Sequence, residues 1–258
     1  MGTILNIAID DPNAADRDCS LAERVVNELF DLASHLEKTF SRFDEGSDLS
    51  RLNRATIGEQ VLVTPEFISA LNLAIEIQHF SSRAFQISAQ PNLIIQNSYV
   101  LKSSNAEVDL TGLSKGYIVD QLALRAKMLA PDCRILINAG GDLKILGAKK
   151  LETNIRIGQQ MRGLYKTLSF SRAALATSAY YMHEEPDSRT TYIGQLRAGF
   201  LAASTVVVNS DSCAMADALT KVALFASNEV VHRCAEKFNS EILVFSEDAT
   251  LEESFGAA

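Results

Sequence analysis

Residues 108–117 read VDLTGLSKGY, and residues 138–142 read NAGGD. These two stretches place two acids, a base and four glycines around an expected helix start and the strand that follows the helix. Glycine allows a backbone to approach a ligand closely, and the first turn of a helix attracts negatively charged groups. The two stretches therefore predict a binding site for a ligand that carries phosphate.

Each stretch also has a simpler explanation. In the first, Lys115 would neutralise a phosphate while Gly112 and Gly116 let the main chain close in. Asp109 would then hold the polar edge of a ring or orient a metal ion. The alternative is an N-capped helix start whose lysine is only solvated. The glycine pair of the second stretch would face a nucleotide or supply the positive φ angles of a hairpin, and taken alone the hairpin is favoured.

The composition is that of an ordinary globular chain. Of 258 residues, 47% are hydrophobic and 22% charged, and the formal net charge is -8. This length is sufficient for one large domain with its own core, and the negative charge argues against nucleic acid as a partner. The four cysteines form no Cys-x-x-Cys pair, so they predict reduced thiols rather than disulfides or a zinc site.

The sequence carries no signal for a membrane. No run approaches roughly 18 apolar residues, the length that a membrane-spanning helix needs. Residues 1–7, MGTILNI, lack the basic start and the small-residue cleavage site of a secretory signal. The chain as given is therefore expected in the cytoplasm, with an export signal removed from it as the alternative.

Hydrophobic periodicity predicts helices and strands in irregular alternation. Short turns join several strand pairs, and this favours an α+β fold with a mixed or antiparallel sheet and packed helices. No linker rich in Pro, Gly or Ser divides the chain, so residues 1–258 are expected to form a single domain. The expected helices are 21–40, 65–80, 114–129, 216–226 and 229–238, and the expected strands are 3–9, 134–138, 143–146, 154–158, 166–171, 204–208 and 241–245.

Two further motifs have functional and structural readings. Residues 176–180, ATSAY, offer two hydroxyls that would bind a diphosphate or close a turn at the end of a strand. In ADALTK, residues 216–221, Asp217 and Thr220 share a helix face and could supply hard oxygen ligands to Mg²⁺. Asp217 and Lys221 are also spaced as an ordinary surface ion pair, which the spacing alone favours.

Taken in order, the motifs resemble those of the FAD:protein FMN transferases, the ApbE-type flavin transferases. The family begins its first strand with Met-Gly-Thr, as residues 1–3 do, and has a Phe-Ser-x-aromatic segment, here FSRF. The resemblance spans nearly the whole chain. The stretches that carry it are 1–3, 40–43, 47–53, 84–86, 109–116, 138–142, 176–180 and 216–220.

The resemblance implies an α+β fold that binds FAD as its substrate. In the family, Mg²⁺-assisted cleavage of the FAD diphosphate places FMN on a Thr or Ser hydroxyl of an acceptor protein and releases AMP. It implies that Mg²⁺ lies between the carbonyl of Gly112 and the side chains of Asp217 and Thr220, and it assigns no catalytic side chain here. The FAD contacts that it implies are Met1, Phe43 by stacking, Ala84, Phe85, Gln86, Asp109 and Lys115.

The sequence departs from the family pattern at four positions. Lys221 stands where the family has a metal-binding threonine, and Gln86 replaces an acid. Tyr192 and Gln195 replace a histidine and an aspartate. These departures predict that flavin binding is better preserved than transfer. One alternative is an FAD- or FMN-binding protein in which Lys221 supplies the positive charge without metal, and another is an interaction protein that has lost the ligand.

Overall fold

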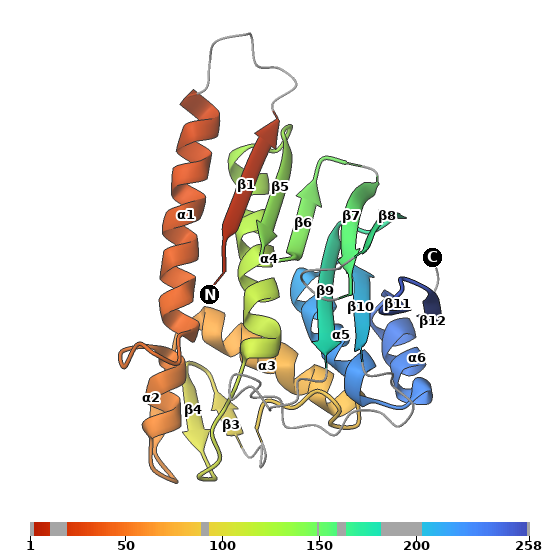
Figure 1. Ribbon diagram of the computed structural model, residues 1–258. Helices are drawn as coiled ribbons and strands as arrows, with labels where there is room; N and C mark the ends of the chain where they lie inside the picture. The colour runs from red at the N-terminus through yellow and green to blue at the C-terminus, as the bar shows by residue number, and fades with distance from the viewer. Residues whose placement is uncertain are drawn as a thin grey trace.

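The computed structural model describes residues 3–10, 20–88, 93–148, 150–158, 164–181 and 203–256 (Figure 1). The helices are α1 (Ser20–Phe40), α2 (Asp48–Arg54), α3 (Pro65–Phe80), α4 (Thr111–Leu129), α5 (Cys213–Phe225) and α6 (Asn228–Lys237). The strands are β1 (Leu5–Asp10), β2 (Gln60–Leu62), β3 (Leu93–Gln96), β4 (Tyr99–Lys102), β5 (Arg134–Ala139), β6 (Asp142–Leu146), β7 (Leu151–Ile157), β8 (Leu164–Phe170), β9 (Ala174–Tyr181), β10 (Ala203–Ser210), β11 (Glu241–Ser246) and β12 (Leu251–Phe255).

The main sheet has seven strands in the order β1-β5-β6-β9-β10-β11-β12. Every neighbouring pair in it is antiparallel. Two smaller antiparallel sheets accompany it, β2-β4-β3 and the hairpin β7-β8. The prediction of an α+β fold with an antiparallel sheet and packed helices is confirmed.

Both faces of the main sheet are covered. On one face α4 and α5 pack against the strands, and α1 and α3 pack against α4 (Figure 1). On the other face the β7-β8 hairpin closes a second apolar cluster over β6, β9, β10 and β11. Val206, Val207 and Val208 of β10 are all buried because successive side chains point to opposite faces.

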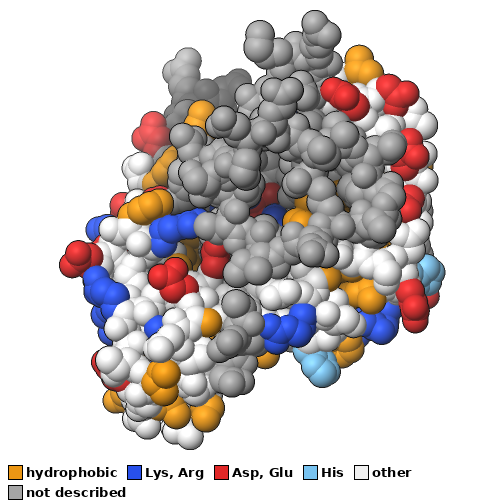
Figure 2. Space-filling model, turned by 60° about the horizontal axis from the view of Figure 1, so that its bottom comes forward, with side chains coloured by type: hydrophobic (Ala, Val, Ile, Leu, Met, Phe, Trp, Pro, Cys, Tyr) orange, Lys and Arg blue, Asp and Glu red, His pale blue; other side chains and the backbone are white. Residues whose placement is uncertain are grey.

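The small sheet keeps one apolar face in solvent. Leu62 lies directly opposite Tyr99, and their exposed fractions are 52% and 43%. Ile94 of β3 is 48% exposed, whereas Val61 and Val100 point to the core. Figure 2 shows hydrophobic side chains at the lower left, in the region that Figure 1 places at β3 and β4. The sheet therefore lies at the edge of the molecule.

Close contact between α4 and α5 fixes the geometry of the candidate site. A Cβ atom at Gly116 would lie 2.3 Å from the carbonyl oxygen of Cys213, so only glycine fits there. One turn later, the Asp120 carboxylate accepts hydrogen bonds from the backbone N–H of Cys213 (3.0 Å) and of Ala214 (2.9 Å). It also pairs with Lys144 at 2.6 Å. This packing brings Lys115 of α4 to within 4.0 Å of Asp217 in the middle of α5.

The structure differs from the expected elements in four respects. The helix expected from residue 114 begins at Thr111, because the Asp109 carboxylate accepts a hydrogen bond from the Thr111 N–H at 2.8 Å. The helix expected from residue 216 begins at Cys213, where Ser212 and Asp120 satisfy the free N–H groups. Residues 176–180 lie inside β9, so the prediction that they form a turn at the end of a strand is wrong. Five strands were not expected: β2, β3, β4, β9 and β12.

Among the described helices, none combines the length and the apolar composition that a membrane span requires.

Candidate functional site

Lys115 and two acids form the centre of a charged cluster between α4, β6 and α5. The Lys115 ammonium pairs with Asp142 Oδ2 and lies 4.0 Å from Asp217 Oδ2. The Lys115 side chain is 29% exposed, whereas those of Asp142 and Asp217 are 2% and 1% exposed. A ligand can therefore reach the lysine but not the carboxylates.

Lys221 holds the other side of Asp217. Its ammonium pairs with Asp217 Oδ1 and donates to the Asp217 carbonyl oxygen at 3.1 Å and to Ser178 Oγ at 3.3 Å. The hydroxyl of Thr220 donates to the same carbonyl at 2.7 Å and lies 2.7 Å from Ser178 Oγ. The ion pair predicted from the spacing of Asp217 and Lys221 is confirmed, but its acid is buried rather than on the surface, because α5 packs against α4 and β9.

The cluster perturbs the titration of its members. Burial raises the pKa of Asp142 to about 7; the charge of Asp217 acts in the same direction, and Lys115 and Lys221 oppose it. Burial lowers the pKa of Lys115, but the charges of Asp217 and Asp142 outweigh burial and raise it above its usual value. Lys115 therefore stays protonated, while Asp142 changes charge near neutral pH.

Protonation of Asp142 should make stability depend on pH. Its folded pKa of about 7 lies above the reference value of 3.8, so between these values the native state holds a proton that the unfolded chain has lost. The stabilisation is complete below this range and is lost as pH rises through it. We expect urea denaturation to show the wild-type free energy of unfolding falling relative to that of Asp142→Asn over this range, then levelling off. Parallel curves for the two proteins would contradict the buried, coupled carboxyl.

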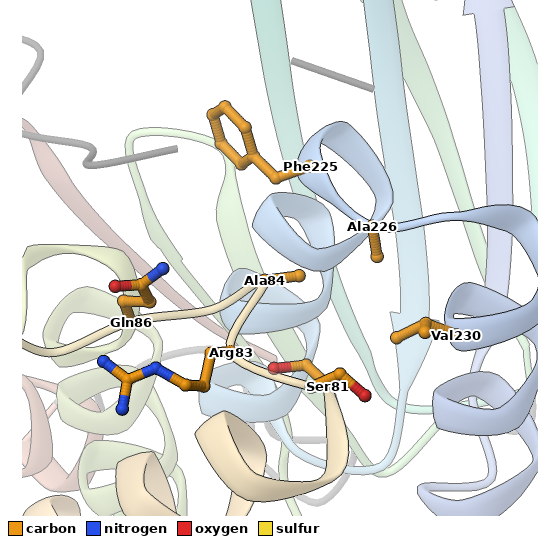
Figure 3. Close-up of a pocket in the computed structure, with 8 residues that line it drawn as sticks. Ser81, Arg83, Ala84, Gln86, Phe225, Ala226 and Val230 are labelled. Carbon is orange, nitrogen blue, oxygen red and sulfur yellow. The ribbon is translucent and has the colours of Figure 1, made fainter. Parts of the chain in front are cut away.

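A pocket of about 260 Å³ lies between the segment after α3 and the end of α5. Figure 3 shows its short apolar side chains, Ala84, Ala226 and Val230, with Arg83 and Gln86 on the other side. Ser82 and Arg83 have φ angles of 53° and 66°, the left-handed region that side chains other than glycine rarely adopt. Phe225, which also lines the pocket, follows Lys221 by about one helical turn. The pocket and the charged cluster thus lie toward the same end of α5.

The remaining predicted residues lie around the start of α4. The backbone N–H of Asp109 donates to the carbonyl of Ile87 at 2.7 Å, which ties the predicted 84–86 segment to the 109–116 stretch. Phe43 is 90% exposed and lies against the Arg42 guanidinium, which donates to Thr111 Oγ1 at 2.9 Å.

Other predicted residues are buried or lie outside the described ranges. Phe85 is 1% exposed and packs in the core. Gly112, in the first turn of α4, is partly buried. Met1, Tyr192 and Gln195 lie outside the described residues.

Neither the role of Asp142 nor the contact between Ser178 and Lys221 was expected from the sequence. Asp142 directly follows the glycine pair, and this position could have indicated that its carboxylate lies near Lys115. Ser178 is one of the two hydroxyl residues quoted from residues 176–180. Its contact with Lys221 depends on the packing of β9 against α5, which is distant in the sequence.

Residues 112–116, GLSKG, also match the Gly-x-Ser-x-Gly pattern of serine hydrolases. That motif works when its serine sits on a sharp turn from a strand into a helix. Here Ser114 already lies inside α4, and its backbone N–H donates to the carbonyl of Leu110 at 2.8 Å. The match therefore does not present a nucleophile.

The ligands that the resemblance implies for Mg²⁺ do not fit a divalent cation as these residues are arranged. Asp217 Oδ1 is taken by the Lys221 ammonium, and Asp217 Oδ2 faces the Lys115 ammonium at 4.0 Å. That second oxygen is buried and accepts no hydrogen bond. A Mg²⁺ ion on Asp217 would therefore meet two positive charges. Within the described ranges, no group of three or more His, Cys, Asp or Glu residues could hold a metal ion.

The chain is similar to one protein family over most of its length. The model described as the ApbE family matches residues 1–95 and 91–245. The flavin transferase ApbE from Vibrio cholerae is 18% identical with a TM-score of 0.74, over 100% of this chain and 94% of that chain. The flavinyl transferase ApbE from Pseudomonas stutzeri is 17% identical with a TM-score of 0.70, over 99% and 97%. The ApbE protein from Thermotoga maritima is 16% identical with a TM-score of 0.74, over 98% and 94%. No curated protein matches the chain.

Proposed function

The chain belongs to the ApbE family, and from this membership we propose that it is a flavin transferase that uses FAD. In the proposed reaction a Thr or Ser hydroxyl of an acceptor protein attacks the phosphorus on the flavin side of the FAD diphosphate. The bond from that phosphorus to the bridging oxygen breaks, AMP leaves with the bridging oxygen, and the hydroxyl proton is released. The observation that best supports the proposal is the partly exposed ammonium of Lys115, which lies beside the buried carboxylates of Asp142 and Asp217.

Lys115 is proposed to bind the diphosphate. An ammonium has three donors, and the close pair with Asp142 uses one of them. The exposed part of the side chain can donate to phosphate oxygens, and hydrogen bonds between charged groups are the stronger kind. A cation held in place before the ligand arrives also stabilises the charge that develops on the diphosphate during transfer.

The segment at residues 81–86 and Phe43 are proposed to hold the rest of FAD. The pocket beside Ala84 and Gln86 provides an apolar surface with polar groups at one side. The exposed ring of Phe43 is free to stack on the flavin. Arg42, through its bond to Thr111, keeps this segment beside the first turn of α4.

Mg²⁺ would supply further neutralisation of the diphosphate where a protein binds it. In their present contacts, however, Gly112, Asp217 and Thr220 do not fit the ion. We also propose that residues 1–258 act as one domain. One cluster of buried side chains runs from Val25 in α1 to Phe255 in β12, which supports this.

A second candidate is an FAD- or FMN-binding protein that does not transfer the flavin. The contact between Lys221 and Asp217 favours it, because this lysine occupies an oxygen that the family's metal ion would use.

Incubation of the purified protein with FAD, Mg²⁺ and a cell extract tests the proposal. We expect AMP release together with a protein band that keeps flavin fluorescence after denaturation. FAD binding without AMP above the enzyme-free control would favour the second candidate. Failure to bind FAD would contradict both.

A further inference from the structure

The Lys221 ammonium is enclosed by oxygen atoms. It contacts a carboxylate oxygen, Asp217 Oδ1, the Asp217 carbonyl oxygen at 3.1 Å and the Ser178 hydroxyl at 3.3 Å. An ammonium carries three N–H donors and no acceptor, so these contacts use all three. The Lys221 side chain is 16% exposed, and that of Asp217 is 1% exposed. These three oxygen atoms therefore form a cation site, and the cation that occupies it is the ammonium group of Lys221.

The oxygen types around Lys221 are those that a hard divalent cation prefers. Mg²⁺ binds carboxylate, carbonyl and hydroxyl oxygens and requires near-octahedral geometry at short range. To reach Asp217 Oδ1 it would have to displace the Lys221 ammonium, and on Asp217 Oδ2 it would face Lys115 at 4.0 Å. Two ammonium groups already balance the charges of Asp142 and Asp217.

We infer that Lys221 replaces the divalent cation in this site and makes ligand binding independent of Mg²⁺. All of its donors are used within the protein, so Lys221 acts on the ligand through Asp217. By neutralising Asp217, it leaves the charge of Lys115 available to the diphosphate. The inference rests on the proposed function for the identity of the ligand, which is a dinucleotide with a linking diphosphate.

Calorimetric titration with FAD, in EDTA and in excess Mg²⁺, tests the inference. For the wild type we expect affinities that agree within about twofold, and for Lys221→Thr an affinity at least about tenfold weaker in EDTA that Mg²⁺ restores. Lys127→Thr, which removes an exposed lysine from the last turn of α4, is the control and should behave as the wild type. A wild-type affinity that rises about tenfold or more with Mg²⁺ would overturn the inference.

A measurement without FAD separates this inference from the proposed function. Paramagnetic resonance measures the free Mn²⁺ ion, so the bound ion follows by difference, and Mn²⁺ takes the same oxygen ligands. We expect Lys221→Thr to bind Mn²⁺ at concentrations where the wild type binds none. Equal binding by both proteins, or tight binding by the wild type, would overturn the replacement by Lys221.

The two measurements also separate their failures. If Lys221→Thr does not fold, the two wild-type measurements still decide the question, because either one can contradict metal independence. If the wild type binds no FAD under any condition, the proposed function is wrong. The Mn²⁺ measurement still shows whether Lys221 replaces the divalent cation.

Discussion

Replacing Lys115 with methionine is expected to weaken FAD binding by about ten- to a hundredfold, because a charged hydrogen bond to the diphosphate is lost. The same change should lower the free energy of unfolding by about 3–5 kcal/mol at pH values above the pKa of Asp142, since it leaves a buried carboxylate without its partner. Methionine keeps the length of the side chain and removes its charge. Titration with FAD and urea denaturation measure the two effects.

A double variant separates ligand binding from folding. Asp142→Asn added to Lys115→Met removes the unpaired carboxylate, so most of the lost stability should return. FAD affinity should stay low because the cation is still missing. If the stable double variant bound FAD as tightly as the wild type, Lys115 would have no part in the site.

Gly116→Ala is expected to lower the free energy of unfolding by about 3 kcal/mol, the upper part of the range for an overpacked interior. The new Cβ would lie 2.3 Å from the carbonyl oxygen of Cys213 and 2.7 Å from the backbone nitrogen of Ala214. Both contacts are backbone atoms of α5, so relief requires the two helices to separate. Since this movement also displaces Lys115 from Asp217, FAD affinity should fall as well.

Gly46→Ala is the matched control for the glycine change. Gly46 has a negative φ, and its nearest neighbour would be the end of the Asp44 side chain at 3.3 Å. This exposed loop should accept the methyl group with a change within about 0.5 kcal/mol. Equal stability of Gly116→Ala and Gly46→Ala would show that the α4–α5 contact tolerates a side chain.

The longer helices could be predicted because their apolar residues repeat with the helical period. Thr64 and Pro65 marked the start of α3, where the Thr64 hydroxyl accepts from the Phe67 N–H at 3.3 Å. The start of α5 has a local signal of the same kind, Ser212, whose hydroxyl accepts from the Met215 N–H at 3.2 Å, but the rest of its capping could not be predicted. Asp120, which is distant in sequence, satisfies its first N–H groups. The strands β2, β3 and β4 are 3, 4 and 4 residues long, too short for a reliable period.

The sequence predicted which residues belong to the candidate site better than it predicted their contacts. The sequence indicated Lys115, Asp217 and Thr220 through their motifs, and the spacing of Asp217 and Lys221 predicted their ion pair. The partnership of Lys115 with Asp142 depends on α4 crossing in front of β6, which no local pattern encodes. Burial of the Asp217 carboxylate likewise comes from packing between α5 and its neighbours.

We propose that the Lys115 ammonium, which pairs with the buried Asp142, binds the diphosphate of FAD. A crystal structure of the protein with FAD tests it most directly. We expect the Lys115 ammonium to lie within hydrogen-bonding distance of a diphosphate oxygen while Lys221 remains paired with Asp217. FAD bound elsewhere, with Lys115 contacting Asp142 alone, would show that Lys115 does not bind the diphosphate.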